Sequence, residues 1–148
     1  MRSIDSPEEM EELGVALAGR LVAGDTLILS GPLGAGKTAL TKGIGKALGI
    51  STITSPTFVI AKEYKGKTPL IHIDAYRLID SSQRQFEFED LDLDTRRESA
   101  ITVIEWGSAL NFKSDEQYLE VKIAFGEGED ERLVEFAGHG QRWAGFSL

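Results

Sequence analysis

The chain has no cysteine among its 148 residues, which excludes disulfide bonds, thiolate metal sites and cysteine nucleophiles. It also lacks any apolar run that approaches the roughly 18 residues of a membrane-spanning helix. The N-terminal stretch Met1–Ser6 has none of the apolar character of a secretory signal peptide. These absences predict a cytoplasmic protein with no membrane partner, in the compartment where nucleoside triphosphates are abundant.

Positive charge is also scarce. The sequence has 16 basic and 24 acidic side chains, for a formal net charge of −8 at pH 7. This balance opposes unaided binding to nucleic acid through phosphate contacts, so any RNA that the protein serves is expected to be held by a partner. The length of 148 residues and the 41% hydrophobic content predict one globular domain spanning residues 1–148.

Residues 31–38 are the most informative segment that is present. They fit the phosphate-binding loop pattern G-x-x-x-x-G-K-[ST] and read Gly31, Pro32, Leu33, Gly34, Ala35, Gly36, Lys37 and Thr38. The apolar run Leu27–Leu29 before the loop has the character of a strand, and Leu40, Ile44 and Leu48 after it recur at helical spacing. Strand, loop and helix therefore follow one another in the order that this pattern requires.

The residue types in this loop explain how it would bind a nucleotide. Glycines allow the backbone to turn tightly, so that successive N–H groups face inward around anionic oxygens at the positive end of the helix dipole. Lys37 is expected to reach the β- and γ-phosphates, and the Thr38 hydroxyl is expected to ligate Mg²⁺. The loop therefore predicts a nucleotide and magnesium as cofactors.

Helix-like and strand-like segments alternate along the rest of the sequence. A helix is predicted to begin with Ser6 as its N-cap, Pro7 at its first position and Glu9 completing a capping box. Its apolar face is then formed by Met10, Leu13, Leu17 and Leu21.

Strand character is found in several short segments. Residues 57–64 and 69–74 are predicted to form one hairpin and residues 119–125 and 133–136 a second, while residues 101–104 form a buried strand. Residues 81–99 fit either a strand or a short helix. Together these elements predict an α/β fold, a P-loop NTPase-like sandwich with a mixed sheet and flanking helices.

A phosphate-binding loop needs acids at the ends of neighbouring strands, which hold Mg²⁺ or orient the attacking group. Asp74 and Glu105 each end an apolar strand segment, and from their positions either could be the metal-side acid. Thr57 lies where many P-loop hydrolases have a switch threonine, although an ordinary turn explains Ser55-Pro56-Thr57 better.

Arginine and histidine are two further residue types that could belong to the site. Arg77 and Arg132 could bring positive charge to the phosphates, although a single arginine is more often a surface or ion-pairing residue. His72 alternates with Ile71 and Ile73, so it is expected to fill the opposite face of the sheet and is not predicted to be a metal ligand.

Four motifs in this order resemble the TsaE family, the small bacterial ATPases required for threonylcarbamoyladenosine formation in tRNA. The motifs are Gly31–Thr38, Ser55–Phe58, His72–Leu78 and Ile104–Trp106, which together extend over much of the chain. The resemblance implies a P-loop ATPase that acts on a complex of TsaB and TsaD, in which TsaD transfers the threonylcarbamoyl group to the adenosine beside the anticodon. Contact with tRNA would then be indirect, through these partners.

The resemblance also implies roles for single residues, with ATP and Mg²⁺ as the cofactors. Lys37 corresponds to the phosphate lysine and acts in catalysis with Asp74, the acid important for ATP hydrolysis. Thr38 and Glu105 correspond to the magnesium ligands. Nucleotide contacts are implied for residues 31–38 and also for Ala39, Thr57, Trp106, Ser6, Pro7 and Arg132.

Three other functions fit parts of the sequence. A small-molecule P-loop kinase would share the loop and use Arg96 and Arg97 as lid arginines, but 148 residues leave little room for a lid and an acceptor domain. A GTPase would usually carry an Asn-Lys-x-Asp segment after a late strand, and the sequence has none. A nucleotide-gated interaction module with little hydrolysis would use the same lysine and Mg²⁺, so the sequence does not separate it from an ATPase.

Overall fold

A computed structural model of the protein describes residues 1–51, 53, 61–74, 98–105 and 117–148. The elements in chain order are β1 (Arg2–Ile4), α1 (Pro7–Ala18), β2 (Thr26–Ser30), α2 (Lys37–Ala47), β3 (Ala61–Tyr64), β4 (Leu70–Asp74), β5 (Ile101–Glu105), β6 (Tyr118–Phe125), β7 (Arg132–His139) and the short 3-10 helix η2 (Gln141–Trp143). Among these described elements, no helix has the length and apolar character needed to cross a membrane.

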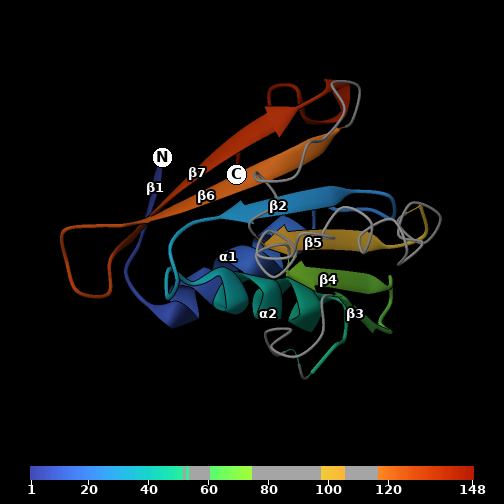
Figure 1. The fold of residues 1–148 in the computed structure, drawn as a ribbon, viewed down its shortest axis with the longest axis horizontal. Helices are drawn as coiled ribbons and strands as arrows, with labels where there is room; N and C mark the ends of the chain where they lie inside the picture. The colour runs from blue at the N-terminus through green and yellow to red at the C-terminus, as the bar shows by residue number, and fades with distance from the viewer. Residues whose placement is uncertain (52, 54–60, 75–97, 106–116) are drawn as a thin grey trace, which may run out of the picture.

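The described strands form one mixed sheet in the order β1-β7-β6-β2-β5-β4-β3 (Figure 1). The central strand β2 runs parallel to both β5 and β6, and β4 runs parallel to β5. Antiparallel pairing joins β3 to β4 and β6 to β7, which confirms both predicted hairpins within the described residues. Residues 57–60, which the sequence assigned to the first hairpin, lie outside them.

Both described helices pack on the same face of this sheet (Figure 1). The predicted apolar face of α1 is confirmed for Met10, Leu13 and Leu17, which are buried in a core with Leu40 and Ile44 of α2. Leu21, predicted as part of the same face, is buried in this core but lies beyond the helix, which ends at Ala18. The opposite face of the central strands is buried as well, through residues such as Ile28, Ile71 and Ile104. Burial on both faces explains why these strands read as continuous apolar runs rather than alternating ones.

α1 and α2 cross at a pair of glycines. A Cβ atom built on Gly43 would overlap the backbone carbonyl of Glu11, and one built on Gly14 would overlap the carbonyl of Leu40. Because these neighbours are backbone atoms, no side-chain rotation could relieve the overlap. The two glycines therefore set how closely α2, and the loop that precedes it, lie against α1.

The N-terminus of α1 forms largely as predicted. The Ser6 Oγ accepts a hydrogen bond from the Glu9 backbone N–H at 3.1 Å. The reciprocal bond differs from a standard capping box, because the Glu9 carboxylate accepts from the Asp5 N–H at 3.1 Å and not from the N–H of Ser6 itself. The helix is thereby tied to the residue that directly follows β1.

Two elements at the ends of the chain were not predicted. One is β1, which pairs antiparallel with β7. The first strand of the chain is therefore β1 and not the predicted strand Leu27–Leu29. Near the other terminus, Trp143 is 2% exposed, and Arg142 donates from Nε and Nη2 to the two carboxylate oxygens of Asp25 at 3.1 and 3.0 Å. This bidentate pair holds the C-terminal segment against the turn that leads into β2.

Candidate functional site

The phosphate-binding pattern lies between the carboxyl end of β2 and the start of α2. Gly34 and Gly36 have φ angles of 82° and 112°, which are left-handed values that glycine adopts without strain. A Cβ atom on Gly31 would lie 2.5 Å from the Ile123 carbonyl oxygen of β6. Turn geometry therefore requires glycine at positions 34 and 36, and the close approach of the β6 backbone requires it at position 31.

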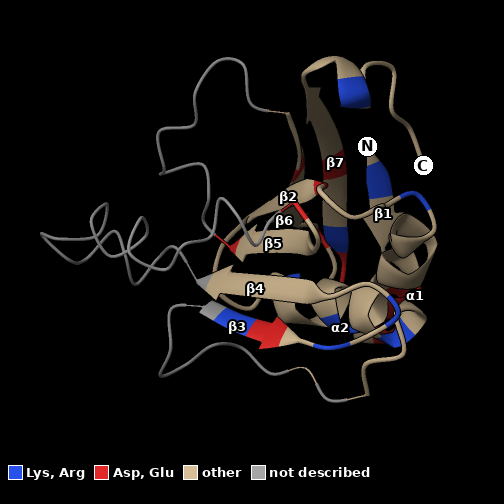
Figure 2. Ribbon diagram, turned by 90° about the vertical axis from the view of Figure 1, so that its right-hand side faces the viewer, with Lys and Arg blue, Asp and Glu red and all other residues tan. Residues whose placement is uncertain are grey.

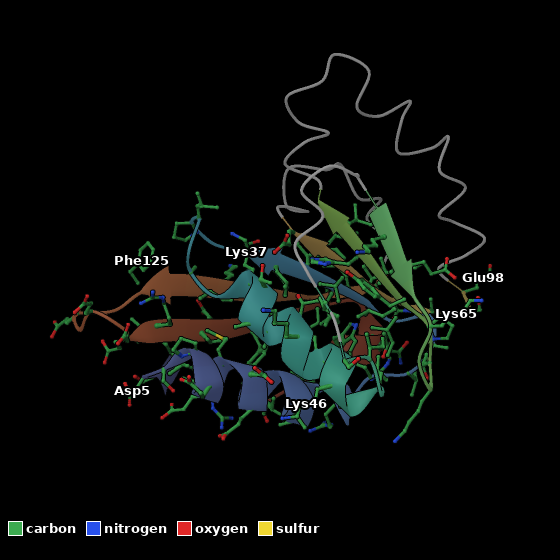
Figure 3. All side chains as sticks on the ribbon, turned by 90° about the horizontal axis from the view of Figure 1, so that it is seen from below. Asp5, Lys37, Lys46, Lys65, Glu98 and Phe125 are labelled. Carbon is green, nitrogen blue, oxygen red and sulfur yellow. The ribbon has the colours of Figure 1, made fainter. Side chains whose placement is uncertain are left out.

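Lys37, the first residue of α2, is bent back over this loop (Figure 3). Its Nζ donates to the carbonyl oxygens of Gly31 and Pro32 at 2.6 and 3.1 Å. The residue is 7% exposed, so its positive charge is held in a largely buried position at the mouth of the loop. This placement agrees with its predicted role as the phosphate lysine.

The N-terminus of α2 has the features of an anion site. Gly36 is the N-cap and provides no side-chain cap, and the first turn carries no acidic residue that would repel a phosphate. The helix dipole adds partial positive charge at this end. The backbone geometry, the dipole and Lys37 therefore all favour bound phosphate at the same place.

Glu105 lies at the end of β5, beside the strand that leads into the loop. It pairs in register with Leu29 of β2 on one side and with Asp74 of β4 on the other. In Figure 2 the β5 ribbon is tan, the colour of uncharged residues, and turns red, the colour of acidic residues, only at its carboxyl end. The sheet thus brings both predicted acids to the edge from which the loop emerges, and Glu105 is buried there with 6% exposure.

The donor types beside the loop fit Mg²⁺. Thr38 provides a hydroxyl in the first turn of α2, and Glu105 provides a carboxylate. Within the part of the chain that is described, no three His, Cys, Asp or Glu side chains form a group that could hold a metal alone. Mg²⁺ commonly uses one or two protein oxygens and completes its shell with phosphates and water, so this sparse set is suitable for it.

His72 is a neighbour of Glu105 that sequence reasoning did not anticipate. It pairs in register with Val103, which belongs to the core facing the helices, so its predicted position on the face opposite Ile71 and Ile73 is confirmed. Its Nε2 lies 3.5 Å from the Glu105 Oε2, and its side chain is fully buried. Only the order of β4 and β5 in the sheet reveals this contact.

On the other side of the loop, an open cavity of about 70 Å³ gathers residues from three elements. Its lining includes Ser6, Pro7, Met10, Gly34, Ala35, Gly36, Ala39, Asp130 and Arg132. The structure therefore brings the predicted nucleotide contacts Ser6, Pro7, Ala39 and Arg132 together beside the loop. Met10 and Asp130 join them without having been predicted for the site.

Arg132 connects the β6–β7 turn to the loop. Its Nη2 donates to the Gly34 carbonyl oxygen at 3.4 Å, and its Nη1 donates to the carbonyl oxygens of Glu129 and Glu131. The guanidinium also lies over the ring of Phe125, with 4.7 Å from Cζ to the ring centroid. These contacts place a cation at the rim of the cavity.

Several predicted residues lie outside the described part of the chain. They are Ser55, Pro56, Thr57, Arg77, Arg96, Arg97 and Trp106. The proposed switch threonine and the tryptophan after the metal acid therefore remain predictions. The same holds for the helix-or-strand alternative over residues 81–97.

Comparison with known proteins gives a consistent result. The family model described as "Threonylcarbamoyl adenosine biosynthesis protein TsaE" matches residues 4–134. Proteins named tRNA threonylcarbamoyladenosine biosynthesis protein TsaE are similar over most of their length. The one from Streptomyces coelicolor is 47% identical over 142 residues, covering 91% of this chain and 94% of that protein. The one from Bacillus subtilis is 39% identical over 141 residues, covering 93% and 85%.

A solved structure agrees with the sequence relatives. The crystal structure of Bacillus subtilis YdiB superposes with a TM-score of 0.77 at 32% sequence identity. The match covers 97% of this chain and 87% of that one. The predicted α/β fold with a mixed sheet and helices packed on it is therefore confirmed.

Proposed function

This chain belongs to the TsaE family of tRNA threonylcarbamoyladenosine biosynthesis proteins, and we propose that within that pathway it is a magnesium-dependent ATPase. ATP would bind at the loop of residues 31–38, and hydrolysis would reset or remodel a partner complex of TsaB and TsaD. The protein would act in the cytoplasm, where ATP and tRNA are both present.

One observation carries this proposal, namely that a buried lysine and a buried carboxylate are placed at the same end of the sheet. Lys37 lies over the loop, and Glu105 lies at the end of the strand next to the one that enters it. Both are less than 10% exposed. Opposite charges held at the mouth of an anion site suit a phosphate chain and its metal better than they suit a structural role.

The side chains of this site divide the work of binding and chemistry. The loop backbone and Lys37 would hold the phosphates, and Thr38 with Glu105 would hold Mg²⁺. The metal would supply charge neutralisation between the phosphate oxygens. Asp74, in register with Glu105 at the end of β4, is the proposed residue that orients the attacking water.

The cavity on the far side of the loop supports a place for the base. Pro7, Met10 and Ala39 offer it apolar atoms, and Asp130 and Arg132 are charged residues of the same lining. This division of apolar walls and a few polar groups is typical of small-molecule sites. With the phosphates at the loop and the base in the cavity, Mg²⁺ and the attacking water would lie on the side of the loop that faces Glu105.

The assignment of TsaB and TsaD as partners rests on the family. The net charge of −8 supports it, because a chain with that charge is poorly suited to hold tRNA by its phosphates. Contact with tRNA is therefore proposed to be indirect. The ATPase would drive a cycle whose RNA chemistry takes place on another subunit.

ATP with Mg²⁺ is expected to raise the thermal stability of the wild-type protein. At about 100 times its dissociation constant, a ligand that binds only the folded state adds about 2.7 kcal/mol to the free energy of unfolding. For a chain of this size that corresponds to a rise in Tm of roughly 5–10 °C, which differential scanning fluorimetry would measure.

Lys37→Ala should abolish this rise in Tm. Lys46→Ala provides the matched control, because Lys46 lies in the same helix with 73% side-chain exposure and its ammonium pairs with Glu11 at 3.8 Å, away from the loop. That variant should keep the full rise. A wild-type protein whose Tm does not respond to MgATP would refute nucleotide binding.

Reconstitution would test the pathway role. With TsaB, TsaD, tRNA and a threonylcarbamoyl donor, adding this protein and ATP is expected to allow multiple modification turnovers for each TsaD, whereas Lys37→Ala should not sustain them. Modified adenosine per tRNA would be followed by mass spectrometry. If the number of turnovers is the same with and without this protein, the pathway role is refuted. If the protein instead phosphorylates a small molecule, it is a kinase.

A further inference from the structure

His72 is a buried polar side chain to which the described part of the chain makes no side-chain hydrogen bond. Its exposure is 0%, and neither Nδ1 nor Nε2 has a hydrogen-bond partner among the described residues. Burying an imidazole without hydrogen bonds costs stability, and a strand interior of this kind would be better filled by an aliphatic residue. The position therefore calls for an explanation other than packing.

Among the side chains that the structure describes, the charged group placed beside this imidazole is the carboxylate of Glu105. Their closest atoms, Nε2 and Oε2, are 3.5 Å apart, just beyond the roughly 2.7–3.2 Å of an N–H···O hydrogen bond. Both side chains project from the helix-facing side of adjacent parallel strands, two register positions apart. A small rotation of the carboxylate would therefore close the hydrogen bond without any movement of the backbone.

We propose that His72 is a positioning residue for Glu105. The imidazole would donate from Nε2 to Oε2 of the carboxylate, which would leave the other carboxylate oxygen available to Mg²⁺. This inference rests on the proposed function, because it assumes that Glu105 holds Mg²⁺. Carboxylates that ligate metals are commonly oriented by such outer hydrogen bonds, whose loss lowers metal affinity about 10–100-fold.

The test measures metal affinity and does not depend on catalysis. The dissociation constant of a non-hydrolysable ATP analogue is measured by calorimetry with Mg²⁺ and again with EDTA, and the ratio of the two is the magnesium-dependent gain. His72→Leu is expected to reduce this gain at least about tenfold, while the affinity in EDTA stays at the wild-type value. The free energy of unfolding should be nearly unchanged, because the lost hydrogen bond to Glu105 is offset by removal of the buried Nδ1, which has no partner among the described residues.

Two conservative variants separate the hydrogen bond from the shape of the ring. His72→Gln can place an amide N–H near the position of Nε2, so it should keep most of the gain. His72→Asn places its amide near Nδ1 and should lose the gain. This pair decides the question even if His72→Leu fails to fold.

His139→Leu is the matched control. His139 also lies near a glutamate, with Nε2 at 3.9 Å from Glu120 Oε1, but on the β6–β7 pair. It should keep the wild-type gain. A wild-type gain in both His72→Leu and His72→Asn would overturn the positioning role, whereas a wild-type protein with no gain would overturn the proposed function itself.

Discussion

Replacing Glu105 with glutamine is expected to lower the rate of ATP hydrolysis about a hundredfold or more while the protein remains folded. Glutamine keeps the shape of the side chain and removes its charge. The proposed metal site of Thr38 and Glu105 would then have no carboxylate ligand. Because Glu105 is 6% exposed, loss of the charge also relieves a desolvation cost, and the free energy of unfolding should not fall. Phosphate release at saturating MgATP measures the rate, and urea unfolding measures the stability.

Glu120→Gln is the control for this change. Glu120 lies on β6, the other parallel neighbour of β2, and accepts a hydrogen bond from the Ser30 Oγ at 2.8 Å that the glutamine oxygen can still accept. Hydrolysis in this variant should stay close to wild type. If Glu105→Gln hydrolyses ATP at the wild-type rate, Glu105 is not the metal acid.

Asp74→Asn distinguishes the two acids that register with each other at this edge. If Asp74 orients the attacking water, its loss should reduce hydrolysis but preserve the magnesium-dependent gain in nucleotide affinity. Loss of Glu105 should reduce both. Reversed outcomes would exchange the two roles, which their positions in the sequence left open.

The central part of this architecture could be predicted because its signals are local. The loop pattern, the apolar run Leu27–Leu29 and the buried segment 101–104 each reflect short-range backbone requirements, and all three lie where they were expected. Residues 2–4 were missed as a strand because three residues are too few to show a period, and their partner β7 is far away in the sequence. Strand pairing of that kind depends on tertiary structure rather than on local preference.

The site likewise has a part that local sequence patterns predict and a part that depends on tertiary structure. Its phosphate-binding half is one continuous segment and was found from its pattern. The contact between His72 and Glu105 depends on β4 and β5 being neighbours, and the cavity joins Pro7 to Arg132 across most of the chain. The loop pattern predicted Gly34, Ala35 and Gly36 of the cavity lining, and the family resemblance pointed to Ser6 and Pro7, while Met10 and Asp130 were missed.

The two glycines where α1 and α2 cross have a packing role that cannot be predicted from the sequence pattern. In isolation, Gly14 and Gly43 read as weak positions in two amphipathic helices, where alanine would be about 1 kcal/mol better for each helix. The structure gives them a packing reason, because each Cα faces backbone atoms of the other helix. The sign of a glycine-to-alanine change therefore depends on a contact that no local pattern contains.

Gly43→Ala is accordingly expected to destabilise the protein, by about 3 kcal/mol, where helix propensity alone predicts a gain. The added methyl group meets the Glu11 carbonyl, and relief requires α1 and α2 to separate. Differential scanning fluorimetry should show a fall in Tm of roughly 6–12 °C. Gly128→Ala, whose Cβ would lie an ordinary 3.5 Å from that of Glu131, should leave the Tm nearly unchanged.

The same substitution should also weaken nucleotide binding, because α2 begins with Lys37 and Thr38. Movement of α2 away from α1 shifts these two residues relative to Glu105, which is fixed on β5, and it widens the cavity that Met10 and Ala39 share. Displacements of about 1 Å at such sites can cost a hundredfold in activity. At temperatures where Gly43→Ala is still folded, its affinity for MgATP should therefore be lower than that of the wild type. Wild-type affinity in a destabilised variant would show that the crossing supports the fold and does not set the geometry of the loop.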